Sequence, residues 1–173
     1  MTVSYTTYSE AGGVGKTTTA ANLAVAHARA GLDVLVIPLD SQDANLSRLL
    51  DVDHNRAKED IDTLPHHMIE RPQGAFDGLI ETTEHGVDVV PEHNMLGDLP
   101  SWLRTAKKQA QQINEEFDTK AALLNVLARN NVRDNYDVII CDPPGSEGTE
   151  LHNALNATRS LVLPIEPSAK GSA

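Results

Sequence analysis

The chain has 173 residues, of which 40% are hydrophobic and only one is a cysteine. This length is enough for one globular domain with a core, and the single cysteine excludes an internal disulfide and a four-cysteine metal or iron–sulfur site within one chain. Acidic residues number 25 against 14 lysines and arginines, a net charge of −11; such a surface repels phosphates and argues against a DNA-binding domain.

The acidic surplus has two interpretations. It is either a solvated surface that keeps the protein soluble, or an adaptation to a salt-rich cytoplasm, where the Debye length shortens to about 3 Å at 1 M salt and self-repulsion is screened. We favour the second. No apolar run approaches the roughly 18 residues of a membrane span, and residues 1–10 lack the pattern of a secretory signal. We therefore expect a cytoplasmic protein with no membrane contact.

The first half of the chain predicts two strands and a helix. Residues 2–8 are polar and alternating, as in a strand, and 34–37 form an unbroken apolar run typical of a buried parallel strand. Between them, residues 17–30 are rich in alanine and precede Gly31, which predicts a helix with a glycine at its C-terminal end. Residues 51–74 are charged and interrupted by proline, so we expect a surface excursion with one short helix.

The second half repeats the alternation. Strands are predicted at 87–90, 138–141 and 161–163, separated by helix-length stretches. One helix is predicted to turn a face of spaced apolar residues toward the core: Trp102, Ala106, Ala110, Ile113 and Phe117. A second predicted face, before the break at Asn130 and Asn131, consists of Leu123, Leu124, Leu127 and Ala128.

Alternating strands and helices predict an α/β fold, with a mostly parallel sheet flanked by helices on both faces. We expect residues 1–173 to form a single domain.

A glycine-rich loop at residues 9–19 lies between the first predicted strand and the first predicted helix, where a phosphate-binding loop is found. Its glycines let successive N–H groups point into one concavity, next to the positive end of the helix. Lys16 would reach the β- and γ-phosphates, and the Thr17 hydroxyl would bind Mg²⁺. The strict G-x-x-x-x-G-K-[ST] pattern fails at Glu10, so the loop is a variant. The predicted phosphate-binding residues are Gly12, Gly13, Val14, Gly15, Lys16, Thr17 and Thr18.

Residues 11–18 read Ala-Gly-Gly-Val-Gly-Lys-Thr-Thr. This resembles the Lys-Gly-Gly-x-Gly-Lys-Thr-Thr loop of the ParA/MinD group of ATPases, which have a deviant Walker A loop. Further similarities follow in the same order at residues 19–24, 40–45, 136–145, and 153–155 with 163–167. The resemblance therefore covers nearly the whole chain, and the spacing looks most like the partition ATPases of plasmids and chromosomes.

The resemblance implies roles for two carboxylates. Asp40 would orient or activate the attacking water and help to hold the water shell of the metal, which makes Asp40 and Lys16 the predicted catalytic residues. Asp142 would take the Walker B position and hold Mg²⁺ through water. Mg²⁺ keeps several waters and takes few protein ligands, so Thr17 with Asp40 and Asp142 would suffice. Residues 143–146 would form the second switch, which senses the γ-phosphate.

The chain departs from the family pattern in three places. The signature lysine, which would reach the nucleotide of the partner subunit, is replaced by Ala11, and loss of such a cation slows phosphate transfer. Pro38 stands where the family often has another aspartate, and Glu10 adds a carboxylate beside the loop. The family also continues beyond the point equivalent to residue 173, so we expect the last strand–helix units to be missing.

By this resemblance the chain is an ATP-hydrolysing molecular switch that uses Mg²⁺, forms an ATP-dependent homodimer and acts in plasmid or chromosome partitioning. Its partner would be a ParB-like centromere-binding protein, and direct DNA contact is not expected of so acidic a chain. Two alternatives stay open: a biosynthetic ATP-dependent ligase or amidotransferase of the same superfamily, and a hydrolysis-weak nucleotide-binding remnant that pairs with a full-length paralogue.

Other candidate residues favour structural roles. His66 and His67 have no third ligand at a metal-site spacing and are predicted to lie on the surface. Cys141 lies in an apolar run and is predicted to be a buried, inert thiol. Arg104 with Lys107 and Lys108 is predicted to be a solvated helix face.

Overall fold

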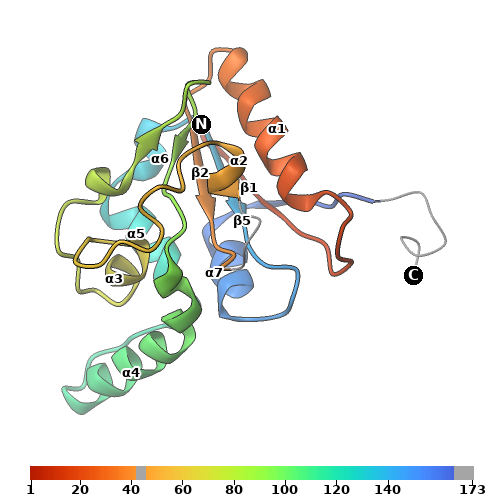
Figure 1. The fold of residues 1–173 in the computed structure, drawn as a ribbon. Helices are drawn as coiled ribbons and strands as arrows, with labels where there is room; N and C mark the ends of the chain where they lie inside the picture. Colours follow the sequence, from red (N-terminus) through yellow and green to blue (C-terminus); the bar gives the residue numbers. More distant parts are fainter. Residues whose placement is uncertain (42–45, 166–173) are drawn as a thin grey trace.

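The computed structural model describes residues 1–41 and 46–165. Six strands form one sheet in the order β3-β4-β2-β5-β1-β6, and every neighbouring pair is parallel except β3 with β4. The prediction of a mostly parallel sheet is confirmed (Figure 1). The strands are β1 (Val3–Thr7), β2 (Val34–Pro38), β3 (Glu81–Thr82), β4 (Asp88–Val89), β5 (Val138–Asp142) and β6 (Ser160–Val162).

Helices cover both faces of this sheet, as predicted (Figure 1). One face carries α1 (Lys16–Arg29) and α2 (Leu46–Leu49). The other carries α3 (Leu64–Met68), α4 (Leu99–Gln112), α5 (Ala122–Arg129), α6 (Val132–Asn135) and α7 (Thr149–Ala157), with the 3₁₀ helices η1 (Phe76–Leu79) and η2 (Asn94–Asp98). In the part of the chain that the structure describes, no helix has the length and apolar character to cross a membrane.

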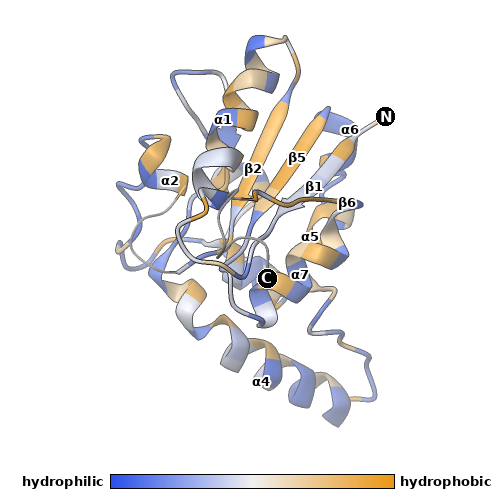
Figure 2. Ribbon diagram, turned by 90° about the vertical axis from the view of Figure 1, so that its right-hand side faces the viewer, coloured by the Kyte–Doolittle hydropathy of each residue, from blue (hydrophilic) through white to orange (hydrophobic). Residues whose placement is uncertain are grey.

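The central strands β2 and β5 are apolar on both sides, and Figure 2 shows them as the most hydrophobic strands. In β2, Leu35 and Ile37 pack under α3 and α5, whereas Val34 and Val36 pack under α1. This division follows from the two-residue period of a strand. An unbroken apolar run is therefore what a strand buried on both faces requires.

Strand β1 lies between β5 and β6 and is buried although its side chains are polar. Two of its hydroxyl groups make hydrogen bonds to other segments: Thr6 Oγ1 lies 2.7 Å from Thr158 Oγ1, and Thr7 Oγ1 donates to Asp142 Oδ1 at 2.6 Å. The buried hydroxyls of Ser4 and Tyr5 have no partner within the described residues. Buried hydroxyls are tolerated when they find such partners. The second of these bonds connects the sheet with the candidate site.

Helix α4 corrects one prediction. The helix ends at Gln112, the following Ile113 is 65% exposed, and the buried residues of the helix are Leu99 and Leu103. Phe117 lies beyond the helix and packs against the core on its own. The predicted stripe from Trp102 to Phe117 is wrong as a core face because the C-terminal part of α4 leaves the body of the molecule (Figure 1).

Helix α5 corrects the register of another predicted face. Leu123 and Leu127 are buried as expected, but Ala128 is exposed. Ala122 and Val126 complete the buried side instead. Asn131, which lies between α5 and α6, has a φ of +50°, which fits the predicted break.

Candidate active site

A cavity of about 370 Å³ lies where the loop after β1 meets the start of α1. All seven predicted phosphate-binding residues line it, although they were chosen from sequence spacing alone. The lining residues are Ser9, Glu10, Ala11, Gly12, Gly13, Val14, Gly15, Lys16, Thr17, Thr18, Asp40 and Gly145. The structure thus brings the loop, the start of the helix and the end of a second strand around one space.

The loop backbone depends on glycine. Gly13 and Gly15 have φ values of +80° and +81°, in the left-handed region that side chains rarely adopt. Gly15 is also the N-cap residue of α1, and no side chain caps that end of the helix. The first turn of α1 carries no acidic residue either. Its N–H groups therefore face the cavity side without a side-chain acceptor, which suits a bound anion.

Lys16 begins α1 and points to the end of β5. Its Nζ lies 3.0 Å from Asp142 Oδ1 and donates to the Pro143 carbonyl oxygen at 2.5 Å. The Asp142 side chain is only 2% exposed, so the ion pair is largely shielded from water. Asp142, a predicted metal-binding residue, is thus held against the predicted phosphate-binding lysine and is not among the residues that line the cavity.

Thr7 is a member of this network that the sequence interpretation missed. Its hydroxyl donates to Asp142 Oδ1 at 2.6 Å, the same oxygen that Lys16 contacts. Its position was predicted as part of a polar strand, but nothing in the sequence shows that its side chain meets a residue 135 positions later. Only the parallel pairing of β1 with β5 brings the two together.

Asp40 lies beyond the end of β2 and lines the same cavity, half-buried. Glu150 in the first turn of α7 is close enough to interact with it. Burial raises the pKa of the Glu150 carboxyl, and the negative charge of Asp40 raises it further. Glu150 was not singled out from the sequence. The rest of the family-like stretch that starts at Asp40, residues 42–45, lies outside the described residues, as do 166 and 167 of the last such stretch.

Gly145, in the predicted second switch, touches the phosphate loop directly. A β-carbon at this position would lie 2.8 Å from the carbonyl oxygen of Ser9. Real β-carbons do not come so close to backbone, so a larger residue would push the two loops apart. The segment after β5 and the loop after β1 are therefore packed backbone against backbone.

Two of the three positions that depart from the family pattern, Glu10 and Ala11, line the cavity, whereas Pro38 is buried at the end of β2. Ala11 and Glu10 are both exposed. The Tyr8 hydroxyl donates to Glu10 Oε1 at 3.4 Å. The position of the family's signature lysine is therefore exposed to solvent.

The histidine pair corrects a prediction in part, since His67 is buried, whereas His66 is partly buried and lines a cavity. The His67 side chain is 6% exposed and its Nε2 lies 2.8 Å from Asp62 Oδ2, while His66 Nδ1 lies 3.5 Å from Asp62 Oδ1. The Asp62 carboxylate thus contacts both rings, and these polar contacts offset the cost of burying the ring nitrogen atoms. No cluster able to hold a metal is found within residues 1–41 and 46–165.

The remaining sequence candidates behave as predicted. Cys141 is fully buried, and burial raises the pKa of its thiol to about 12, so it is not a nucleophile at neutral pH. Arg104, Lys107 and Lys108 are exposed on α4.

The cavity has the features of a site for a phosphate chain. It combines a glycine-dependent loop, uncapped helix N–H groups and a lysine. Thr17 and Asp40 add oxygen atoms of the kind that Mg²⁺ prefers. Open space within 4 Å of the ideal β-carbons of Gly12, Gly13 and Gly15 leaves the loop accessible to such a group.

The sequence matches a family model described as an AAA domain, AAA_31, over residues 5–172. Among curated proteins, it is 32% identical to the sporulation initiation inhibitor protein Soj of Bacillus subtilis over 155 residues, which cover 90% of this chain and 54% of Soj. It is 29% identical to the chromosome-partitioning ATPase Soj of Treponema pallidum, with 90% and 53% coverage. The chain thus spans about half the length of these relatives.

Solved structures share the fold. Cobyrinic acid a,c-diamide synthase from Mycobacterium smegmatis, with a bound ATP analogue and magnesium, superposes with a TM-score of 0.78 at 24% identity, covering 95% of this chain and 59% of the other. The septum site-determining protein MinD from Pyrococcus horikoshii, complexed with Mg-ADP, gives 0.71 at 24% identity, with 99% and 60% coverage. At these identities the matches show a common architecture.

Proposed function

The chain belongs to the ParA/MinD family of P-loop ATPases, and we propose that it is an ATP-hydrolysing molecular switch of the ParA type. The observation that carries this proposal is the single cavity around which the seven loop residues and Asp40 meet. Sequence relatives support the partition role, because one of them is named a chromosome-partitioning ATPase.

In this proposal the loop binds the phosphate chain of ATP. The N–H groups of residues 12–18 would donate to phosphate oxygens, and Lys16 would neutralise charge at the β- and γ-phosphates. Lys16 is held by Asp142 and Pro143 in the structure, so binding would exchange one anionic partner of the lysine for another. The cost of separating the pair is offset by the charge of the incoming phosphates.

Mg²⁺, when bound, would neutralise charge on the phosphate oxygens. The Thr17 hydroxyl would hold it directly, and Asp40 and Asp142 would hold it through water. Asp40 would also accept a hydrogen bond from the attacking water and take its proton. Gly145 and the loop after β5 would respond to the terminal phosphate, since that loop touches the phosphate loop.

We propose that hydrolysis is slow. A cation from the partner subunit stabilises charge in the transition state of related switches, and this chain has Ala11 at that position. The cycle would consist of ATP-dependent pairing of two copies followed by separation after hydrolysis, with a ParB-like protein as the partner that couples the cycle to plasmid or chromosome DNA. The net charge of −11 disfavours direct DNA contact.

The test uses the two predicted catalytic residues. Lys16→Ala should abolish binding of fluorescently labelled ATP, whereas Asp40→Ala should bind it and fail to release phosphate. Lys120→Ala and Asp134→Ala, at exposed positions, are the matched controls and should behave as the unmodified protein. Full ATP affinity in Lys16→Ala, or an unchanged phosphate-release rate in Asp40→Ala, would refute the proposed site.

A biosynthetic ligase is the second candidate, because the cobyrinic acid a,c-diamide synthase structure superposes with a TM-score of 0.78. Such an enzyme activates a carboxylate with ATP, so its phosphate release requires a carboxylate substrate and an amide donor. Phosphate release by the protein with ATP and Mg²⁺ alone, increased by a partner protein, favours the switch. Release that appears only with a carboxylate substrate and glutamine favours the ligase.

A further inference from the structure

A second cavity, of about 410 Å³, lies between α3 with the residues after it and the exposed part of α4. It shares no lining residue with the phosphate-loop cavity, and its volume is in the range of small-molecule sites, roughly 300–1,000 Å³. The proposed ATPase cycle does not use it. Its lining includes His66, Arg71, Trp102, Thr105 and Gln109.

The charge of this cavity is opposite to that of the molecule. Among its described lining residues, Arg71 is cationic, His66 can become so, and none is acidic, in a chain whose net charge is −11. A cation that lies in a concave site concentrates anions there even when the rest of the surface repels them. The cavity therefore favours a ligand with a negatively charged group.

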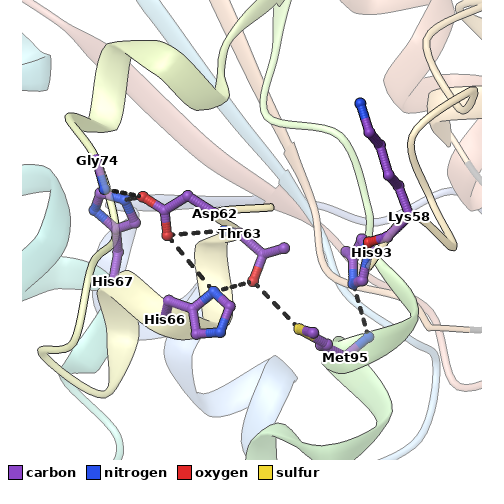
Figure 3. Close-up of polar contacts among 8 residues, drawn as sticks. All are labelled: Lys58, Asp62, Thr63, His66, His67, Gly74, His93 and Met95. Carbon is purple, nitrogen blue, oxygen red and sulfur yellow. Dashed lines mark hydrogen bonds and ion pairs between the residues drawn. The ribbon is translucent and has the colours of Figure 1, made fainter. Parts of the chain in front are cut away.

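Contacts to one ring nitrogen, Nδ1, fix the orientation of the His66 ring. Figure 3 shows its Nδ1 directed at Asp62 and Thr63, at 3.5 Å from Asp62 Oδ1 and 3.0 Å from Thr63 Oγ1. The Thr63 hydroxyl is itself placed near Met95 Sδ, at 3.8 Å. Because Nδ1 is engaged by these groups, the opposite ring nitrogen, Nε2, is left for a ligand, and it donates a hydrogen bond to an anion when both ring nitrogens carry a proton.

Arg71 connects the segment after α3 with α4 by a hydrogen bond. One of its Nη atoms donates to Gln109 Oε1 on α4 at 2.6 Å. A guanidinium has five N–H donors in a planar fork, and this bond uses one of them, so the head group is oriented and still has donors for a carboxylate or phosphate. Such groups accept two parallel hydrogen bonds from arginine.

Two rings form part of the cavity wall. The Trp102 and His66 rings lie with centroids 5.7 Å apart and planes 32° apart. Ile69 and Ala106 add apolar surface beside them. A planar ring gains contact area and favourable stacking on such a wall.

We propose that this cavity binds a small anion that carries a planar ring, with the ring against Trp102 and the carboxylate or phosphate on Arg71 and His66. The proposal does not rest on the proposed ATPase function, because the two cavities have no lining residue in common. The oriented cation, the fixed imidazole and the aromatic wall converge on one space, and together they specify both halves of the ligand.

Trp102 is the only tryptophan of the chain, so its fluorescence reports on this cavity alone. The full chain is titrated with phenyl phosphate and with benzoate, which tell a phosphate-bearing ligand from a carboxylate-bearing one. Inorganic phosphate supplies the charge without the ring, and benzyl alcohol the ring without the charge. We expect saturable quenching by at least one ring-bearing anion and at least about ten-fold weaker binding of both controls, corresponding to ~1.4 kcal/mol.

Arg71→Gln should weaken binding of the effective probe about ten-fold or more, as expected for loss of charge-assisted hydrogen bonds. Arg104→Gln, at an exposed arginine on α4 outside the lining, is the matched control and should bind as the unmodified chain does. Each titration is repeated in Lys16→Ala to remove any contribution from the phosphate loop, and by saturation-transfer NMR on the probe. Binding unchanged in Arg71→Gln, equal binding of inorganic phosphate, or no saturable binding by either method would overturn the proposal.

Discussion

At the scale of single residues, one carboxylate oxygen, Asp142 Oδ1, connects three elements of the site, β5, β1 and α1. Asp142 Oδ1 accepts from Thr7 and lies 3.0 Å from Lys16 Nζ, so two elements other than its own determine where this carboxylate lies. Thr7 does not line the cavity. It is a positioning residue, whose hydroxyl helps to fix the Asp142 carboxylate that contacts Lys16.

Replacement of Thr7 by valine keeps its shape and removes the hydroxyl. We expect the free energy of unfolding to fall by about 1 kcal/mol, as for one buried hydrogen bond, and the Mg²⁺ concentration needed for tight ATP binding to rise. Thr7→Ser restores the donor and should reverse both effects. Titration of labelled ATP at several Mg²⁺ concentrations checks this. An unchanged Mg²⁺ dependence in Thr7→Val would mean that Thr7 is only structural.

A second carboxylate, Asp62, stabilises the segment before α3. Its Oδ2 accepts from the backbone N–H of Gly74 at 2.8 Å and contacts His67 Nε2 at 2.8 Å, and its Oδ1 accepts from the N–H of Thr63 at 3.0 Å. Burial raises the pKa of Asp62, but hydrogen bonds from the Gln73 backbone and from His67 outweigh it and hold the pKa below its usual value.

A lowered pKa in the folded state stabilises the fold while the group is ionised. This contribution is complete above the unfolded pKa of about 3.9 and is lost as the pH falls through the lower folded value. Asp62→Asn should therefore lower the free energy of unfolding at pH 7 by about 1–3 kcal/mol, and the difference from the unmodified chain should shrink below about pH 4. Urea denaturation at several pH values measures both, with Glu59→Gln as the exposed control. A difference that grows in acid would contradict the assignment.

At the scale of elements, the loops after β1 and β5 pack against each other. The helix α1 begins at the end of the first loop, and the second loop touches that loop at Ser9 and Gly145. We therefore expect a change in one loop to move the other. This contact is the physical route by which the loop after β5 would sense what the phosphate loop holds.

Gly145→Ala tests this coupling. A β-carbon placed 2.8 Å from the Ser9 carbonyl oxygen must displace backbone, so we expect a loss of stability of about 1–3 kcal/mol, as in other overpacked positions, together with weaker ATP binding. Gly78→Ala, where a β-carbon meets no atom within 4 Å, is the control. Calorimetry with and without ATP separates the two effects. Normal affinity in Gly145→Ala would show that the loops move independently.

At the scale of the whole molecule, charge is the dominant feature. The net charge of −11 must be accommodated on the surface of a small domain, and the resulting repulsion favours the unfolded chain. Salt weakens this repulsion because the Debye length falls from about 10 Å at 0.1 M to ~3 Å at 1 M.

We therefore expect the free energy of unfolding to rise with potassium chloride over this range. A variant with the exposed residues Glu59, Glu115 and Glu116 changed to glutamine should be more stable at low salt and should gain less from added salt. Urea denaturation at each salt concentration provides the measurement. Stability that does not change or decreases with salt would remove the interpretation as an adaptation to a salt-rich cytoplasm.

The sequence alone predicted the parts of this protein that depend on local patterns. The buried strands β2 and β5, the helix that ends before Gly31 and the glycine-dependent loop follow from side-chain period and backbone conformation. These are properties of a few consecutive residues. The positions of the loop glycines and Lys16 were predictable for the same reason.

The tertiary structure decided everything that depends on contacts between distant segments. The bond from Thr7 to Asp142, the burial of His67 against Asp62 and the cavity beside Trp102 each require the strand order or the packing of α4, which no local pattern contains. The apolar spacing from Trp102 to Phe117 predicted a core face incorrectly, because the position of α4 also depends on contacts between distant segments. A helical period shows which side chains share a face, but only the fold determines what that face meets.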